Sequence, residues 1–251
     1  MRLCSDPIKR LSLELGGKSP NIVFEDANIE DALASSVWAI YNCAGQSCEA
    51  RSRVLVERTL YDEFVARFIE FAGRVKVGDP LDPETQMGSL ISPAHRAKVH
   101  AFVEEGLEEG AEVVLGGETP GGSGAFYPPT VLASVENRMI VAHEEIFGPV
   151  AAIIPFEDEQ DAIRIANDVK YGLFATVWTG DAGRGHRLAR AIKAGTVGIN
   201  MPYTAFPGVP FGGYKQSGFG RELGIETLEL YLETKSVLVS TSGRAFNPFG
   251  L

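Results

Sequence analysis

Hydrophobic positions along the chain alternate between two periods. Short β-branched runs favour strands, and segments whose apolar residues recur every three or four positions favour helices. The expected strands cover 21–24, 53–57, 112–115, 150–156, 173–179 and 196–200, and the expected helices cover 29–41, 60–75, 93–109, 158–168 and 182–194. Alternation of this kind predicts an α/β fold with an open, mainly parallel twisted sheet and helices on both of its faces.

The last fifth of the chain has a different character. Residues 200–220 are rich in glycine and include three prolines, which predicts a long structured loop. A short helix is expected at 225–230. We expect one domain over residues 1–232, a terminal strand at 233–239 and a flexible tail at 240–251.

Charge and hydropathy exclude several classes of partner. The net charge of -10 argues against binding to nucleic acid or to anionic membranes. No apolar run approaches the ~20 residues that span a bilayer. The first residues reach Asp6 and Pro7 before any signal-type apolar core forms, so we expect a cytoplasmic protein.

The cysteine count also limits the chemistry. Three dispersed cysteines do not form a disulfide framework, and no Cys or His pair has metal-ligand spacing, so no metal site is expected. Cys48 follows Gly45 and Gln46, which we expect to end the helix that begins at residue 29. A thiol there can be partly exposed, with a thiolate stabilised by backbone amides. A single cysteine is nevertheless more often a small packed residue. We assign that structural role to Cys43, inside the expected helix.

Three further segments contain residues suited to catalysis or binding. Glu14 lies between two leucines and precedes two glycines, so it is either a partly desolvated general base or a solvated edge charge. Residues 144–149 place paired carboxylates before Phe147 and a Gly-Pro turn. Such a carboxylate can hold ribose hydroxyls beside an aromatic ring, or the segment is an exposed acidic turn. Residues 210–218 form a substrate mouth or a tight structural connection.

Taken in order, these segments resemble motifs of the aldehyde dehydrogenase superfamily. Residues 13–20 are similar to the general-base motif ELGGKSP, and 45–48 to the nucleophile motif GQxC. Residues 144–149 resemble EEIFGP, and 210–218 resemble PFGGxKxSG. The separations fit as well, because 34 residues lead from the glutamate of the first motif to the cysteine, and 97 more to the second glutamate of the third.

The resemblance implies a role for individual residues. Cys48 would be the nucleophile and Glu14 the general base that activates water. Glu145 would hold the nicotinamide ribose and Phe147 would contact the nicotinamide ring. The implied reaction oxidises an aldehyde to a carboxylic acid through a cysteine thioester. The implied cofactor is NAD, with NADP left open.

Substrate preference is less defined. The sequence around residues 203–206 is similar to that of broad-specificity or amino- and betaine-aldehyde-type members of the superfamily. Tyr203 and Phe206 are therefore expected at the substrate entrance. The aldehyde itself stays open. In this chain, the backbone N–H of Cys48 is the group left to donate a hydrogen bond to the oxyanion that the implied reaction forms. Cys43 replaces an asparagine that is common in the family.

Cofactor binding by this chain alone is in question. The resemblance covers the second half of the family's usual length, and no GxGxxG follows a strand. The alternative function is therefore a non-catalytic or self-associating fragment that needs a separate cofactor-binding partner. We expect little NAD turnover by the chain alone. We also expect a homo-oligomer, because residues 233–239 resemble an element that joins the sheet across subunits in the family.

Overall fold

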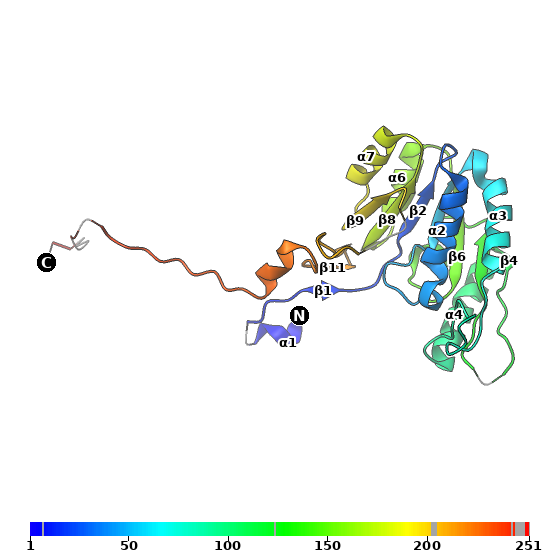
Figure 1. Cartoon of the computed structure of the whole chain (residues 1–251), viewed down its shortest axis with the longest axis horizontal. Coiled ribbons are helices and arrows are strands. Elements are labelled where there is room, and N and C mark those ends of the chain that lie inside the picture. The colour runs from blue at the N-terminus through cyan, green and yellow to red at the C-terminus, as the bar shows by residue number, and fades with distance from the viewer. Residues whose placement is uncertain (7, 123, 202–204, 242, 244–248, 251) are drawn as a thin grey trace.

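A seven-stranded sheet forms the centre of the molecule (Figure 1). The computed structural model describes residues 1–251 except 7, 123, 202–204, 242, 244–248 and 251. The strand order is β4-β5-β6-β3-β2-β8-β9, and every neighbouring pair is parallel except β4 with β5. The strands are β2 (Pro20–Val23), β3 (Arg53–Glu57), β4 (Glu112–Leu115), β5 (Thr130–Ala133), β6 (Val150–Phe156), β8 (Phe174–Trp178) and β9 (Thr196–Ile199). The expected mainly parallel α/β sheet is confirmed.

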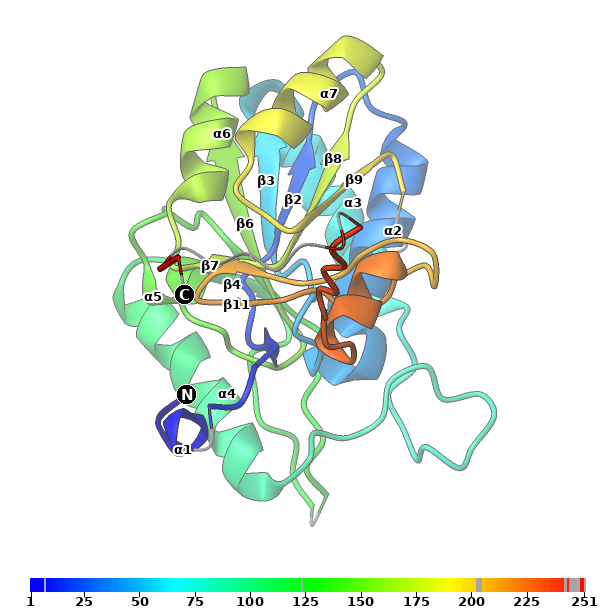
Figure 2. The ribbon, with the colours of Figure 1, turned by 90° about the vertical axis from the view of Figure 1, so that its left-hand side faces the viewer.

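Helices cover both faces of this sheet. Figure 2 shows α6 (Glu159–Asn167) and α7 (Ala182–Ala191) in front of the strands, with α2 (Ile29–Tyr41) and α3 (Tyr61–Gly73) behind them. Crossover helices of this kind bury a parallel sheet on both sides. Beyond the lower edge of the sheet, α4 (Pro93–Glu108) packs against the short α5 (Ile140–His143). The smaller elements are α1 (Arg2–Ser5), β1 (Leu13–Glu14), β7 (Tyr171–Gly172), β10 (Tyr214–Lys215), β11 (Gly218–Phe219) and 3-10 turns at Asn42–Gly45, Arg58–Leu60 and Ile225–Leu230.

Polar side chains cap the helix starts. Asn28, and not the acidic Asp26, caps α2 by accepting a 3.4 Å hydrogen bond from the N–H of Asp31. Asp26 instead accepts a hydrogen bond from Thr179 Oγ1 (3.0 Å) and pairs with Arg184 (3.0 Å). A cap must directly precede the first turn, and Asp26 lies too far upstream.

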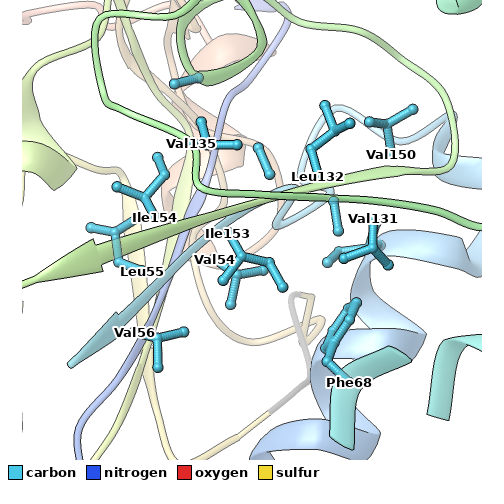
Figure 3. Close-up of a cluster of buried hydrophobic side chains, with 14 of the residues drawn as sticks. Val54, Leu55, Val56, Phe68, Val131, Leu132, Val135, Val150, Ile153 and Ile154 are labelled. Carbon is cyan, nitrogen blue, oxygen red and sulfur yellow. The ribbon is translucent and has the colours of Figure 1, made fainter. Parts of the chain in front are cut away.

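Fully buried aliphatic side chains fill the space between the strands and α3. Figure 3 shows residues of β3, β5 and β6 lying together with Phe68 of α3. Val54, Leu55 and Ile153 are each 0% exposed. A strand covered on both faces has no polar side, which explains the continuous β-branched runs in its sequence.

The chain after Leu230 leaves the body of the molecule (Figure 1). Residues 233–239 are exposed and pair with no strand in the described part of the chain, so the expected strand is absent from a single copy. A strand needs a neighbour for its hydrogen bonds, and none lies beside this segment. Its role between subunits stays a prediction. None of the described helices is both long and apolar enough to cross a membrane.

Candidate active site

Three loops meet at the amino ends of three adjacent strands. Gly17 precedes β2, Cys48 precedes β3 and Glu145 precedes β6. These strands lie side by side in the order β6-β3-β2. Open parallel sheets usually bind ligands at the carboxyl ends of their strands, so this cluster uses the opposite edge. Parallel pairing of the strands brings together residues that are up to 128 positions apart in sequence.

Glu14 reaches this edge on the short strand β1. β1 pairs with β11 in antiparallel fashion, with Glu14 opposite Gly218, and the N–H of Leu15 donates to the carbonyl of Ser217 (3.0 Å). Burial and the Glu222 carboxylate raise the pKa of Glu14, while the N–H of Gly213 and Arg221 partly lower it. Both carboxyl oxygens are buried, and neither has a hydrogen bond of normal geometry to the described residues. A raised pKa suits a carboxyl group that must accept a proton.

Cys48 lies in a turn that follows a left-handed stretch of backbone. The helix α2 ends at Tyr41, the end of the range expected for it, and φ is +52° at Cys43, +55° at Ala44 and +70° at Gly45. The pKa of the half-buried Cys48 thiol is raised. Burial is the largest cause, and the carboxylates of Glu49, Glu14 and Glu145 raise the pKa further. The backbone N–H of Cys48 lowers the pKa, because it faces its own sulfur.

Two glycines separate Cys48 from Glu145. The N–H of Gly17 donates to Oε1 of Glu145 (2.9 Å). A Cβ on Gly16 would collide with the Glu145 carboxylate, and one on Gly17 would collide with the Cys48 carbonyl. The absence of side chains at both positions therefore lets the loops approach each other. Burial raises the pKa of Glu145, which the Gly17 N–H and Lys18 partly offset.

Phe147 borders a cleft beside the segment that leads to Cys48. The cleft has a volume of about 520 Å³ and is lined by Cys43, Gln46, Ser89, Leu90, Ile91 and Phe147. The Phe147 side chain is 37% exposed, and its backbone has φ of +58°. His95 of α4 shares a 2.7 Å hydrogen bond with the Phe147 carbonyl and packs edge-on against its ring. An aromatic face is thus fixed at the cleft.

The expected structural role of Cys43 is wrong. Cys43 lies beyond the end of α2 and is exposed, and its side chain lines the cleft with Phe147. The apolar pattern of α2 continues to Tyr41, and nothing local signals that the next residues turn into the left-handed region. Cys43 therefore belongs to the cleft and not to the core.

Residues 210–218 form a structural connection. Lys215 donates to the carbonyl of Asn167 (2.8 Å), the last residue of α6, and to that of Val169 (3.0 Å) just beyond it. The buried Ser217 hydroxyl accepts a hydrogen bond from the N–H of Gly172 (3.0 Å). These contacts direct the chain into β11. This strand pairs with β1, which contains Glu14. The sequence left open whether this segment forms a substrate mouth or a tight structural connection, and these contacts favour the structural connection.

The expected substrate residues receive little support. Tyr203 lies outside the described residues. Phe206 is 45% exposed, and its carbonyl accepts a hydrogen bond from the N–H of Val209 (3.0 Å) in a surface turn. Their place at a substrate entrance stays a prediction.

Sequence reasoning missed two residues of the site. Gln46 accepts from the N–H of Ile91 (2.8 Å) and donates to the carbonyl of Cys43 (3.1 Å), so it fixes the cleft wall. Lys18 is 1% exposed, and burial lowers its pKa to about 7. The glycines and serine around Lys18 gave no sign of its burial. No group of three or more metal-ligating side chains gathers in the described ranges.

Comparison with known proteins identifies the family of the chain. A model of the aldehyde dehydrogenase family matches residues 1–237. A betaine aldehyde dehydrogenase from Bacillus subtilis (strain 168) is 45% identical over 253 residues, which cover 99% of this chain and 52% of the relative. A 5-carboxymethyl-2-hydroxymuconate semialdehyde dehydrogenase from Escherichia coli is 49% identical over 224 residues, which cover 86% of this chain and 47% of the relative.

Solved structures agree with this comparison. A betaine aldehyde dehydrogenase from Staphylococcus aureus in complex with NAD+ has a TM-score of 0.95 at 41% identity, covering 100% of this chain and 50% of its own. An aldehyde dehydrogenase from Bacillus cereus in complex with NAD+ has a TM-score of 0.93 at 45% identity, covering 96% and 49%. The chain spans about half the length of the curated relatives it matches. On sequence and fold together, the chain belongs to the aldehyde dehydrogenase family.

Proposed function

We propose that this chain supplies the nucleophile and the general base of an NAD(P)-dependent aldehyde dehydrogenase. The observation that carries the proposal is the convergence of Glu14 and Glu145 on one thiol. They come from segments 131 residues apart in sequence, and both act electrostatically on Cys48. A half-buried cysteine between a desolvated carboxyl group and a second carboxylate suits nucleophilic catalysis followed by hydrolysis.

The proposed reaction begins at the Cys48 sulfur. The Cys48 thiol gives up its proton to solvent, the thiolate adds to the aldehyde carbon with formation of a C–S bond, and the carbonyl oxygen becomes an oxyanion that faces the Cys48 N–H. A nicotinamide dinucleotide, when bound, supplies the hydride acceptor for this carbon, which leaves a thioester on Cys48. Glu14 then removes a proton from water, the hydroxide oxygen attacks the thioester, and the C–S bond breaks. The carboxylic acid leaves and the cysteine regains its proton.

The residues near Phe147 fit the nicotinamide end of such a cofactor. A ribose needs a hydrogen-bond acceptor for its hydroxyls, and a nicotinamide needs an apolar face. Phe147 lines the 520 Å³ cleft, and Glu145 of the same short segment lines a smaller cavity that Phe147 also borders. Glu145 would turn from the Gly17 N–H to the ribose. The relatives solved with NAD+ support this assignment.

Trapping of the acyl group on Cys48 tests the proposal. A nitrophenyl ester needs no hydride acceptor, so acylation of Cys48 is followed by peptide mass spectrometry, and NADH formation from aldehydes is measured beside it. Betaine aldehyde and a carboxylate-bearing semialdehyde represent the substrates named for the relatives. We expect no acylation of Cys48→Ala. Glu14→Gln should accumulate the thioester at least about 100-fold longer, since general-base assistance typically contributes 10²–10⁴-fold.

The assignment fails if Cys48→Ala keeps normal ester turnover, or if Glu14→Gln releases the acyl group as fast as the unchanged chain. Cys43→Ala is the matched control, because Cys43 is an exposed thiol in the same loop as Cys48. It should be acylated at Cys48 at the normal rate.

We further propose that the chain associates with a second copy through its C-terminal segment. Large apolar side chains are exposed there, including Leu232 (61%), Val237 (76%) and Leu238 (95%). Exposed apolar groups in succession favour association. Sedimentation should show a dimer or larger species at micromolar concentration, and Leu238→Asp should shift it towards the monomer. A monomer for both forms would contradict this assembly.

A further inference from the structure

The turn that contains Cys48 also contains a second ionisable side chain, Glu49. The N–H of Ala50 donates to the carbonyl of Ser47 (3.1 Å), which closes a turn with Cys48 and Glu49 at its centre. Ser47 Oγ donates to Oε1 of Glu49 (3.2 Å), and Arg51 Nη1 donates to Oε2 (2.9 Å). Both oxygens are therefore engaged, and the carboxylate is held within the turn of the nucleophile.

Arg51 is itself firmly placed. It is 1% exposed, and its guanidinium lies 5.2 Å from the ring centre of Phe174 in β8 and 5.9 Å from that of Trp38 in α2. A guanidinium between aromatic rings gains cation–π attraction and keeps its charge when buried. Arg51 thus anchors Glu49 to two elements of the fold. Burial raises the pKa of Glu49, and the charge of Arg51 and the Ser47 hydroxyl counter that rise.

Three carboxylates from separate elements act electrostatically on the Cys48 thiol. Glu49 comes from the turn itself, Glu14 from β1 and Glu145 from the loop before β6. Among these charges Glu49 has the largest effect on the pKa of the thiol. Glu14 and Glu145 have proposed roles in hydrolysis and cofactor binding. The Glu49 carboxylate has no such role, although it is the most strongly fixed of the three.

We propose that Glu49, clamped by Arg51, is a positioning residue that holds a negative charge beside the sulfur and keeps Cys48 as a thiol in the resting site. This inference rests on the proposed function, in which Cys48 is the nucleophile. The thiolate is the form that reacts with electrophiles and oxidants. A fixed carboxylate beside it therefore shields the cysteine at neutral pH and moves its reactivity to more alkaline pH.

The pH profile of Cys48 alkylation tests the inference. The rate of carboxamidomethylation by iodoacetamide is measured from pH 6 to 10 on the whole chain, and peptide mass spectrometry separates Cys48 from Cys4 and Cys43. Glu49→Gln removes the charge and keeps the shape. We expect its alkylation midpoint to fall by about one pH unit, with labelling roughly 5- to 10-fold faster at pH 7.5, as removal of a nearby like charge implies.

Two single variants separate charge from shape. Glu49→Asp keeps the charge and should retain a midpoint close to that of the unchanged chain. Glu84→Gln removes a carboxylate that is ion-paired with Lys76 (2.7 Å) outside the site, and should leave the profile unchanged. An unchanged profile for Glu49→Gln would overturn the inference. Equal shifts for the Gln and Asp variants would also overturn it, since they would reflect turn geometry.

A double variant keeps the test valid if the single variant misfolds. Glu49→Gln leaves Arg51 buried without its carboxylate, which can be strongly destabilising. Glu49→Gln combined with Arg51→Met removes both charges and should show the same fall in the midpoint. Alkylation reports thiol ionisation without turnover. If Cys48→Ala keeps ester turnover while the alkylation midpoint still moves with Glu49, the proposed function fails and the charge effect stands.

Discussion

Lys18 is a buried cation whose removal should stabilise the fold at neutral pH. It is 1% exposed, and its Nζ makes no hydrogen bond to the described residues. Beside it lies a cavity of about 10 Å³, room for roughly one water molecule. Burial is the main reason that its pKa falls from 10.5 to about 7, and the Arg53 charge adds to the fall. The carboxylates of Glu145 and Glu144 offset part of it.

The size of the effect follows from proton linkage. Between pH 7 and 10.5 the unfolded chain binds a proton at Lys18 that the folded chain has lost. The free energy of unfolding therefore rises with pH in this window, by about 1.4 kcal/mol per pH unit from this group. Below pH 7 both states are protonated and the full cost of about 5 kcal/mol is present. Above pH 10.5 both states are neutral and the cost disappears.

Lys18→Met keeps the length of the side chain and removes the charge. At pH 7 we expect the free energy of unfolding to increase by about 2–4 kcal/mol, and by much less at pH 10. Urea unfolding followed by circular dichroism at pH 7, 8, 9 and 10 measures both the gain and its slope. Lys76→Met, which removes an exposed lysine paired with Glu84, should leave the pH dependence unchanged. An identical slope for Lys18→Met and the unchanged chain would refute the reasoning.

Two further substitutions probe the packing. Gly45→Ala would place a Cβ against the Gly148 carbonyl at a φ of +70°, so a loss of at least about 2 kcal/mol in unfolding free energy is expected, whereas Gly73→Ala has open space and should cost nothing. Thermal unfolding of the two alanine variants compares them directly, and equal melting temperatures would contradict the collision. Phe68→Ala should cost about 3–5 kcal/mol by leaving a core cavity, against less than about 0.5 kcal/mol for Leu81→Ala at a side chain that is 91% exposed. Urea unfolding of both variants measures this difference, and a loss below about 1 kcal/mol at Phe68 would show that the core closes around the gap.

The regular elements were accessible from sequence for a physical reason. Strands such as β3 and β6 are buried on both faces, and their β-branched runs appear without knowledge of the fold. β5 was missed because Pro128 and Pro129 precede it and only four residues follow in strand conformation. The two-residue strands β1 and β11 are too short to have a period. They exist because distant segments meet.

The site could be predicted only as separate motifs. Order and spacing connected Glu14, Cys48 and Glu145 through family resemblance. The hydrogen bond from Gly17 to Glu145 joins residues 128 positions apart, and no local pattern contains it. The clamp of Glu49 by Arg51 depends equally on aromatic rings from α2 and β8. Burial and contact decide these features, and both require the assembled fold.

The placement of the site loops before their strands leaves the far edge of the sheet available for engineering. β6 runs for seven residues from Val150 to Phe156, so its two ends are separated by roughly 20 Å at about 3.3 Å per residue. The loop that follows, at the exposed Glu157, lies at the end remote from Cys48. A fluorophore, affinity tag or inserted peptide attached there would be carried by the same rigid strand that positions Glu145, without entering the space where the three loops meet.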